Sequence, residues 1–373
     1  MCSSTNAGTA CHANATARPA RSRSTSLTCC ADPVPQRSLP SPMTDSSFAA
    51  TPARAHASDE AALAARLASP DAAVRRVALF ELADLEDPGF VPAFIAALRA
   101  DPSPDVRAEA ARVLGAWEQP DVVDALCGAL LDPDDDVRAA AAQSLSELKN
   151  SASGAVLCRW AARPEPFVRR AVLRGLRELR DPGAFAPALH ALDAEHAAVR
   201  AEAVAVLGWL KDPRALPPLA GIATTDTAAD VRRIAVGAIG FAAPDDASTI
   251  HALFVALRDH EWQVREEAAT TLGKLRVATA REPLVAALDD DYWQVRLRAA
   301  RALGQLRDAA AAPAVAALLS HAISNLRKEA ALALGELRDR ATLPALTRAL
   351  EDHDPEVRKA VRIAIRQIDA SSP

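Results

Sequence analysis

The sequence of 373 residues has few aromatic side chains, which make up 4% of it, and it contains a single tyrosine. β-Sandwiches and barrels draw on aromatic and β-branched residues, so this scarcity argues against an all-β fold. The sequence also lacks an apolar run of the roughly 18 residues that a membrane-spanning helix needs, so we expect no membrane partner. Half of the residues are hydrophobic nevertheless, which is enough for a sizeable core.

Methionine and cysteine are also scarce, and their positions divide the chain. Met43 is the second of two methionines, and four of the six cysteines precede it: Cys2, Cys11, Cys29 and Cys30. Residues 1–42 carry no secretory signal; their Arg- and Ser-rich composition is typical of a transit peptide, although a true start at Met43 is the simpler interpretation. We therefore expect a disordered leader at residues 1–58, with a possible true start at Met43, a folded body at residues 59–369 and a short tail at residues 370–373.

Positive charge is in deficit over the folded body. The whole chain carries a net charge of -5 and residues 1–42 carry +3, so the remainder carries -8. Nucleic-acid binding needs a net basic surface, and DNA binding is therefore the least favoured function. After Met43 only Cys127 and Cys158 remain, at matched apolar positions, which indicates core thiols and a reduced, cytoplasmic protein.

What the sequence has in abundance is self-similarity. A Val-Arg or Leu-Arg step recurs ten times at intervals of 31 to 33 residues: Val74, Val106, Val137, Val168, Val199, Val231, Val264, Val295, Leu326 and Val357. Apolar residues follow at offsets of 4, 8 and 11, which place them on one face of a helix. A shorter apolar helix, as at residues 88–99, 213–223 and 340–350, is expected before each step. The chain therefore encodes ten helix–turn–helix units that must stack to bury their apolar faces.

The segments DPDDDVRAAAAQSLSEL, VRAEAVAVLGWLKDPRALPPL and DDDYWQVRLRAARALGQLRD show the repeat at its clearest. They resemble HEAT repeats of the short bilin-lyase (PBS-lyase) type, whose period is near 31. The resemblance covers nearly all of the chain after residue 58. It implies an all-α fold, a right-handed α-solenoid of about ten HEAT-like helix–turn–helix repeats, and it says little about function.

Two enzymatic alternatives follow from the resemblance. Bilin-lyase-like chromophore handling is implied by the resemblance alone. Deoxyhypusine hydroxylases hold a di-iron centre through His-Glu pairs that open second helices, and the matching positions here contain no histidine: Ala108-Glu109, Ala201-Glu202, Glu266-Glu267 and Lys328-Glu329. Since no other catalytic or metal-ligand pattern is present, we expect no catalytic residue, metal or cofactor. The glutamates are expected to pair with neighbouring arginines on the helix surface.

Charged residues recur at the turns between the two helices of a unit. The arginine of the step is present in all ten units, and an aspartate lies six residues before it in six of them, as at Asp101 and Arg107. This offset predicts a ladder of charge pairs that fixes each turn and the stagger of neighbouring units. An anion-binding stripe is the alternative interpretation.

The aromatic residues are the best indication of a binding surface. Ten residues after the step most units carry a polar residue, but two adjacent units carry Trp209 and Phe241, an exposed apolar pair of the kind that anchors partners. Trp262, Tyr292 and Trp293 form a second cluster, although a Trp at the start of a second helix could instead pack over its own turn. We therefore predict a non-catalytic scaffold that binds an unidentified protein at these five residues, with a small-molecule ligand disfavoured.

Overall fold

The computed structural model describes residues 62, 63 and 65–370, and these are built from helices without a strand. The predicted all-α solenoid is confirmed, with a first and a second helix in each repeat. The leader, the possible start at Met43 and residues 371–373 of the tail lie outside the described residues. None of the helices in residues 62–370 is both long enough and apolar enough to cross a bilayer.

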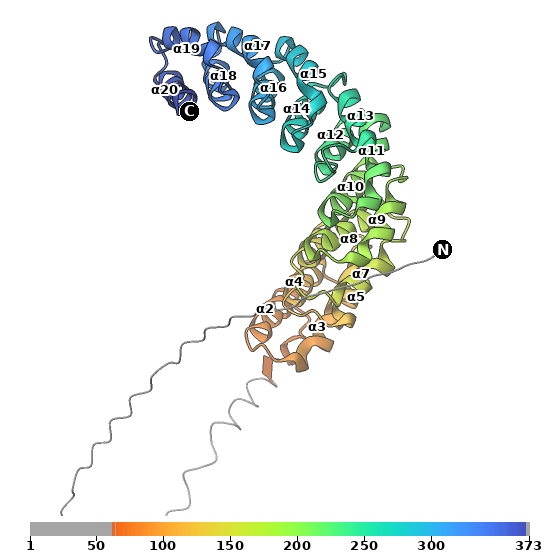
Figure 1. The fold of residues 1–373 in the computed structure, drawn as a ribbon. Helices are drawn as coiled ribbons and strands as arrows, with labels where there is room; N and C mark the ends of the chain where they lie inside the picture. The colour runs from red at the N-terminus through yellow and green to blue at the C-terminus, as the bar shows by residue number, and fades with distance from the viewer. Residues whose placement is uncertain (1–61, 64, 371–373) are drawn as a thin grey trace, which may run out of the picture. The chain divides into compact units, whose positions relative to one another are not determined.

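The second helices form one row of the solenoid, with each packed against the next. In chain order they are α2 (Ala72–Ala83), α4 (Pro104–Leu114), α6 (Asp135–Ser146), α8 (Pro166–Leu179), α10 (Ala197–Leu210), α12 (Ala229–Ala238), α14 (Trp262–Leu275), α16 (Trp293–Leu306), α18 (Ser324–Leu337) and α20 (Pro355–Asp369). Figure 1 shows this row along the inner, concave side of the curved repeat region.

The first helices are shorter and form the outer row (Figure 1). They are α3 (Val91–Ala100), α5 (Pro120–Ala129), α7 (Ser153–Trp160), α9 (Phe185–Ala191), α11 (Leu216–Thr225), α13 (Ala247–Ala256), α15 (Arg281–Ala286), α17 (Ala312–Ala317) and α19 (Leu343–Ala349). Short 3-10 turns enter or leave several of them: η1 (Pro88–Phe90), η2 (Pro182–Ala184), η3 (Pro213–Ala215), η4 (Ala278–Ala280), η5 (Ala287–Asp289), η6 (Ala309–Ala311), η7 (Leu318–Ser320) and η8 (Arg340–Thr342).

Local sequence explains where these helices begin and end. The side chains of Asp71, Asp134 and Asp354 accept hydrogen bonds from first-turn amides, which otherwise lack a partner. At their C-terminal ends, five second helices are followed by a basic residue with a positive φ between 53° and 57°: Arg180, Lys211, Arg276, Arg307 and Arg338. The left-handed conformation stops the helix, and a cation there complements the negative end of the helix dipole.

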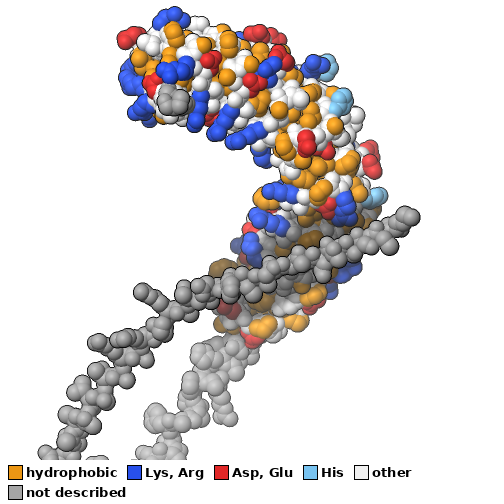
Figure 2. All heavy atoms as spheres, in the orientation of Figure 1, with side chains coloured by type: hydrophobic (Ala, Val, Ile, Leu, Met, Phe, Trp, Pro, Cys, Tyr) orange, Lys and Arg blue, Asp and Glu red, His pale blue; other side chains and the backbone are white. Residues whose placement is uncertain are grey.

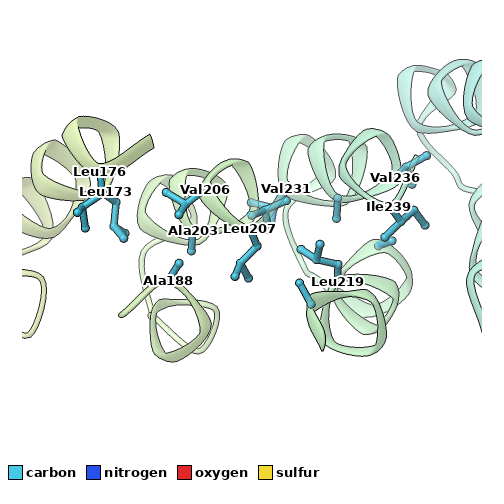
Figure 3. Close-up of a cluster of buried hydrophobic side chains, with 14 of the residues drawn as sticks. Leu173, Leu176, Ala188, Ala203, Val206, Leu207, Leu219, Val231, Val236 and Ile239 are labelled. Carbon is cyan, nitrogen blue, oxygen red and sulfur yellow. The ribbon is translucent and has the colours of Figure 1, made fainter. Parts of the chain in front are cut away.

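The core lies between the two rows, as the repeat pattern predicts. Figure 3 shows Leu173, Leu176, Val206, Leu207 and Ile239 of the second-helix side facing the first helices, and these side chains are essentially inaccessible to solvent. Leu219 of α11 packs into the same cluster from the outer row. A continuous apolar layer of this kind cannot form from one repeat alone, so stability depends on stacking.

Glycine allows the second helices to approach one another closely. A Cβ atom added to Gly273 would lie 2.7 Å from the Cα of Ala302, and one added to Gly304 would lie 2.9 Å from the Cα of Ala333. Real Cβ atoms do not approach backbone so closely, so glycine at these positions is required by packing and not by a turn. The cost in helix propensity, about 1 kcal/mol per glycine, is offset by this contact.

Candidate functional site

The ladder of charges along the turns exists, but it joins neighbouring repeats. Arg75 of α2 donates from Nε and Nη2 to both carboxylate oxygens of Asp101, at 2.7 Å each, across the interface with the next repeat. Its Nη1 donates to the carbonyl oxygens of Ser69 and Pro70 in its own turn. One guanidinium therefore holds its own turn closed and ties it to the next repeat.

We call each such bidentate pair a rung. Six rungs are present in the described residues: Arg75–Asp101, Arg107–Asp132, Arg200–Asp226, Arg232–Asp259, Arg265–Asp290 and Arg327–Asp352. The sequence offset of six pairs each arginine instead with the backbone carbonyl of the aspartate in its own turn, as from Arg107 to Asp101 at 2.9 Å. The ladder therefore lies where it was predicted, but the predicted side-chain pairs are wrong. Each aspartate carboxylate points toward the preceding repeat and pairs with the arginine there.

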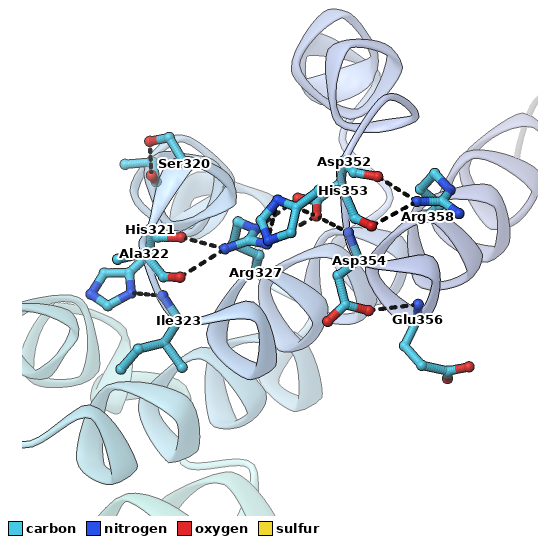
Figure 4. Close-up of polar contacts among 11 residues, drawn as sticks. Ser320, His321, Ala322, Ile323, Arg327, Asp352, His353, Asp354, Glu356 and Arg358 are labelled. Carbon is cyan, nitrogen blue, oxygen red and sulfur yellow. Dashed lines mark hydrogen bonds and ion pairs between the residues drawn. The ribbon is translucent and has the colours of Figure 1, made fainter.

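The rungs are shielded from water, since none of their side chains is more than 14% exposed. Figure 4 shows Arg327 between the turn carbonyls of His321 and Ala322 and the carboxylate of Asp352. The hydrogen bond from Arg327 lowers the pKa of Asp352 despite partial burial. At Asp226, burial alone would raise the pKa, but the hydrogen bonds from Arg200 and the Ala228 amide outweigh it and hold the pKa below its ordinary value. These aspartates remain charged through the neutral range.

Three interfaces lack a rung because another residue stands where the aspartate should be. Arg163 takes this place opposite Arg138, and Ala194 takes it opposite Arg169. Arg169 has a buried Nε atom without a hydrogen-bond partner. Between α16 and α18 the place belongs to His321, whose Nε2 lies 3.4 Å from Nη1 of Arg296. The repeat that contains α8 therefore lacks a rung on both of its sides.

Trp209 is the predicted binding residue that the structure presents most openly. Its side chain is 51% exposed, near the C-terminal end of α10. The guanidinium of Arg180 lies over the indole ring, 4.6 Å from its centroid. A pocket of about 360 Å³ opens beside it on the second-helix row, lined by Arg177, Ala205, Gly208, Trp209, Lys211, Ile234 and Ala238. The pocket therefore combines an apolar floor with a basic rim.

Phe241 does not join Trp209 as an equally exposed neighbour. It is half-buried and packs partly against the core. The prediction of two exposed aromatics assumed that the second helix continues to this position, whereas α12 ends at Ala238. Once the chain leaves helical geometry, the ten-residue offset no longer points to solvent, so this part of the prediction is wrong.

The second aromatic cluster lies at the turn edge, at the opposite ends of the second helices from Trp209. Trp262 stacks on Tyr292 of the next repeat with ring centroids 5.4 Å apart. Tyr292 and Trp293 are 45% and 36% exposed. The five predicted residues thus form two separate surfaces, and Trp262 packs on the following repeat instead of only over its own turn.

Basic residues on the concave face were missed by the sequence analysis. Figure 2 shows Lys and Arg side chains along the inner edge beside α8 and α10 and again below α14 to α18. On α8, Arg170, Arg174 and Arg177 follow one another at spacings of four and three residues. This spacing, which places them on one helix face, is the signal that could have found them.

Three of the four glutamates that match the hydroxylase positions form ion pairs, and two of the pairs join neighbouring repeats. Glu202 binds Arg177 at 2.9 Å, and Glu329, which is buried, binds Arg301 at 2.7 Å. Glu109 pairs within its own helix with Arg112 at 3.1 Å. Glu267 is half-buried, and burial raises its pKa. The described residues contain no cluster of three His, Cys, Asp or Glu side chains placed to hold a metal ion.

The two cysteines of the repeat region are packed among apolar side chains. Cys127 is fully buried, Cys158 is half-buried, and both are free thiols. Burial raises the pKa of both thiols, so they are protonated and poorly nucleophilic near neutral pH.

Comparison with known proteins agrees with this architecture. Residues 60–146, 91–171, 154–240, 225–296 and 281–366 match the family described as HEAT repeats. The chain is a HEAT-repeat protein. No curated protein matches its sequence.

Several solved structures share the fold of this HEAT-repeat protein at low identity. An engineered protein is 20% identical with a TM-score of 0.50, over 83% of this chain and 99% of that one. Kap95p, whose binding induces the switch loops of RanGDP to adopt the GTP-bound conformation, is 14% identical with a TM-score of 0.63, over 86% of this chain and 51% of Kap95p. Importin β is 14% identical with a TM-score of 0.58, over 84% of this chain and 51% of importin β. The HEAT-repeat protein therefore spans about half the length of these two.

Proposed function

We propose that this HEAT-repeat protein is a non-catalytic scaffold that binds another protein through the concave row of second helices. The observation that carries the proposal is the pocket beside Trp209, where a large aromatic side chain stands half-exposed over an apolar floor. An exposed aromatic residue beside a pocket is typical of the anchors that dominate binding energy at protein interfaces. The structure of Kap95p offers a precedent, since that solenoid binds RanGDP.

The chemistry of the described residues supports a scaffold in a reducing compartment. The thiols of Cys127 and Cys158 are free, and their raised pKa values disfavour a nucleophilic role. The arginines and aspartates at the turns are engaged in rungs that join repeats, which is a structural use of charge. The free thiols support our proposal that the protein acts in the cytoplasm.

A comparison of partner capture by two double variants tests the proposal. Wild-type protein and the variant Trp209→Ala with Phe241→Ala are crosslinked in native extract, and captured proteins are quantified by mass spectrometry. We expect a specific partner to be lost from the variant. The control variant, Tyr292→Ala with Trp293→Ala, should retain that partner if the concave face is the interface. Equal recovery by wild type and the Trp209 variant would remove Trp209 and Phe241 from the interface.

The turn-edge cluster is a second proposed contact surface. Trp262, Tyr292 and Trp293 lie too far along the helices from the Trp209 pocket to form one apolar patch with it, because they begin second helices and Trp209 ends one. The same capture experiment assigns this surface. A protein that is lost only from the Tyr292 and Trp293 variant binds there.

A further inference from the structure

Positive charge is concentrated on α8. Arg170 and Arg174 are exposed, and Arg177 is half-buried on the same face of the helix. Arg169, Arg170 and Arg174 have no carboxylate partner among the described residues, and only Arg177 forms ion pairs, with Glu178 and Glu202. This is unusual in a chain whose net charge is -5 and whose other step arginines are mostly engaged in rungs. The α8 face therefore carries two exposed guanidinium groups, those of Arg170 and Arg174, that no carboxylate in the described part of the chain neutralises, and that of Arg170 lies over the Phe167 ring at 5.9 Å from its centroid.

Two grooves flank this row of arginines on the second-helix surface. One, of about 190 Å³, lies between α6 and α8 and is lined by Ala139, Ala142, Gln143, Phe167, Arg170, Ala171 and Arg174. The other is the pocket beside Trp209, with Arg177 and Lys211 on its rim. Both have small apolar residues in the floor and basic residues at the edge. A single bound segment could therefore contact both grooves across α8.

We propose that the concave face of α6 to α12 binds an acidic peptide segment of the partner protein. Its carboxylates contact Arg170 and Arg174 and approach Arg177, which already pairs with Glu178 and Glu202, and one large apolar side chain enters the pocket beside Trp209. This proposal rests on the proposed scaffold function and names the chemistry of the partner. Arg170 and Arg177 are about 10 Å apart along the helix axis, which three extended residues span, so a short linear segment satisfies the row.

Charge complementarity favours an acidic peptide over the other segments that could dock. Guanidinium groups bind carboxylates through two parallel hydrogen bonds, and a partly enclosed groove strengthens them. A nucleic acid strand needs basic groups continuously along its path, whereas Glu178 and Glu202 pair with Arg177 and interrupt the basic row. A peptide with spaced carboxylates fits such an interrupted row.

A labelled-peptide titration of the full chain tests the proposal. The probe is a fluorescein-labelled peptide of about ten residues, roughly 33 Å when extended, with acidic residues followed by one phenylalanine. The comparison probes are the same peptide with phenylalanine replaced by alanine, a lysine-for-acid version, and a single-stranded oligothymidylate. We expect saturable binding of the first probe, weaker binding of the alanine peptide and none of the lysine peptide. Binding should weaken between about 50 and 300 mM salt, as the Debye length shortens.

Variants locate the binding to α8. Reversing two charges, Arg170→Glu with Arg174→Glu, should weaken binding at least about tenfold, and Trp209→Ala should weaken the phenylalanine probe more than the alanine probe. Lys359→Glu is the matched control, because Lys359 occupies in α20 the same repeat position as Arg170 in α8 and is exposed. Circular dichroism confirms that each variant is folded as wild type.

Each outcome decides between the interpretations. Loss of binding in the α8 variant, with Lys359→Glu unchanged, supports the proposal. Equal binding of the oligothymidylate and the peptides would replace it with polyanion binding, and absence of binding by every acidic peptide would overturn it. The proposed scaffold function fails separately: if the Trp209 variant loses its captured partner while the α8 charge reversal retains it, the scaffold stands and the acidic segment is wrong.

Discussion

The helices α8 and α14 have 14 residues each and occupy equivalent places in their repeats, yet they are held differently. On α14, Arg265 forms a rung with Asp290, and the preceding rung, Arg232–Asp259, ends in the same repeat. On α8, Arg169 faces Ala194 and forms no rung, and Arg138 of the preceding repeat faces Arg163. The step arginine thus stabilises the interface between repeats at α14, whereas on α8 arginines remain available for binding.

The contacts between second helices differ in the same way. Gly273 of α14 lies against the backbone of Ala302, but the equivalent residues of α6 and α8 are Ser146 and Arg177. The helices α6 and α8 pack together less extensively than α14 and α16, and a groove opens between them. One close contact remains, since a Cβ atom added to Gly175 of α8 would lie 2.9 Å from the carbonyl oxygen of Leu145. The two missing rungs and the groove still provide space and free donors, which a partner-binding surface needs.

Lowering the pH is expected to have the largest effect on the difference between α14 and α8, because it protonates the aspartates of all six rungs together. Their aspartates have lowered pKa values, so the rungs stabilise the fold fully above the unfolded-state pKa of about 3.9 and lose this contribution as the pH falls through the lower folded-state pKa. Hydrogen exchange between about pH 5 and pH 3 should show a larger loss of protection in α14 than in α8. Equal losses would contradict a special role for the rungs.

Removing one rung is expected to have the next largest effect. Arg265→Ala leaves Asp290 and two turn carbonyls without their donor, and it should lower the free energy of unfolding by about 2–3 kcal/mol. Arg169→Ala is the matched change on α8, and it should stay within about 0.5 kcal/mol of wild type. Urea unfolding followed by circular dichroism measures both. A similar cost for the two variants would mean that the guanidinium acts through general packing.

Packing between second helices can be tested at one position of the repeat. Gly273→Val places side-chain atoms where the Ala302 backbone lies, and it should cost about 1–3 kcal/mol. Ser146→Val, at the same position in α6, should cost less than about 1 kcal/mol, because the interface with α8 is more open there. Thermal unfolding of the two variants gives the comparison, and a larger loss from Ser146→Val would place the tighter interface at α6.

Adding a rung to α8 should have the smallest effect and the opposite sign. Ala194→Asp places a carboxylate opposite Arg169, as in the six existing rungs, and should stabilise the protein by about 1 kcal/mol. Ala194→Asn keeps the shape without the charge and should gain less. If Ala194→Asp destabilises the protein, Arg169 does not reach the position that the other step arginines occupy.

The repeat pattern of the sequence was sufficient to predict most of the fold. The Val-Arg step placed the second helices, and the apolar offsets identified the buried faces, because helix geometry repeats unchanged from one unit to the next. The partner of each rung could not be read from the offset, since Arg107, Arg232 and Arg265 each have one aspartate six residues before them in their own turn and a second in the next repeat. The distinction needs the direction of the side chain, which only the stacked structure supplies.

The candidate site was predictable in part for related reasons. The exposure of Trp209 followed from the polar residues at its position in other units, and the structure agrees. The same reasoning failed at Phe241, where α12 ends before the aromatic residue is reached. The arginines of α8 escaped notice because each is unremarkable in an Arg-rich sequence, and their significance lies in the absence of a carboxylate partner at Arg170 and Arg174 among the described residues.

The missing rungs around α8 also have a mechanical consequence. A solenoid joined by a rung at every interface resists bending evenly along its length. The two interfaces of the α8 repeat lack a rung and are joined instead by single contacts such as Trp160–Asp124 and Arg177–Glu202, so we expect them to form a more compliant joint. Because the proposed binding face spans this joint, a bound segment would stiffen it and change the curvature of the repeat region. The distance between labels on α2 and α20, measured with and without peptide, would report binding as a change of shape far from the contact.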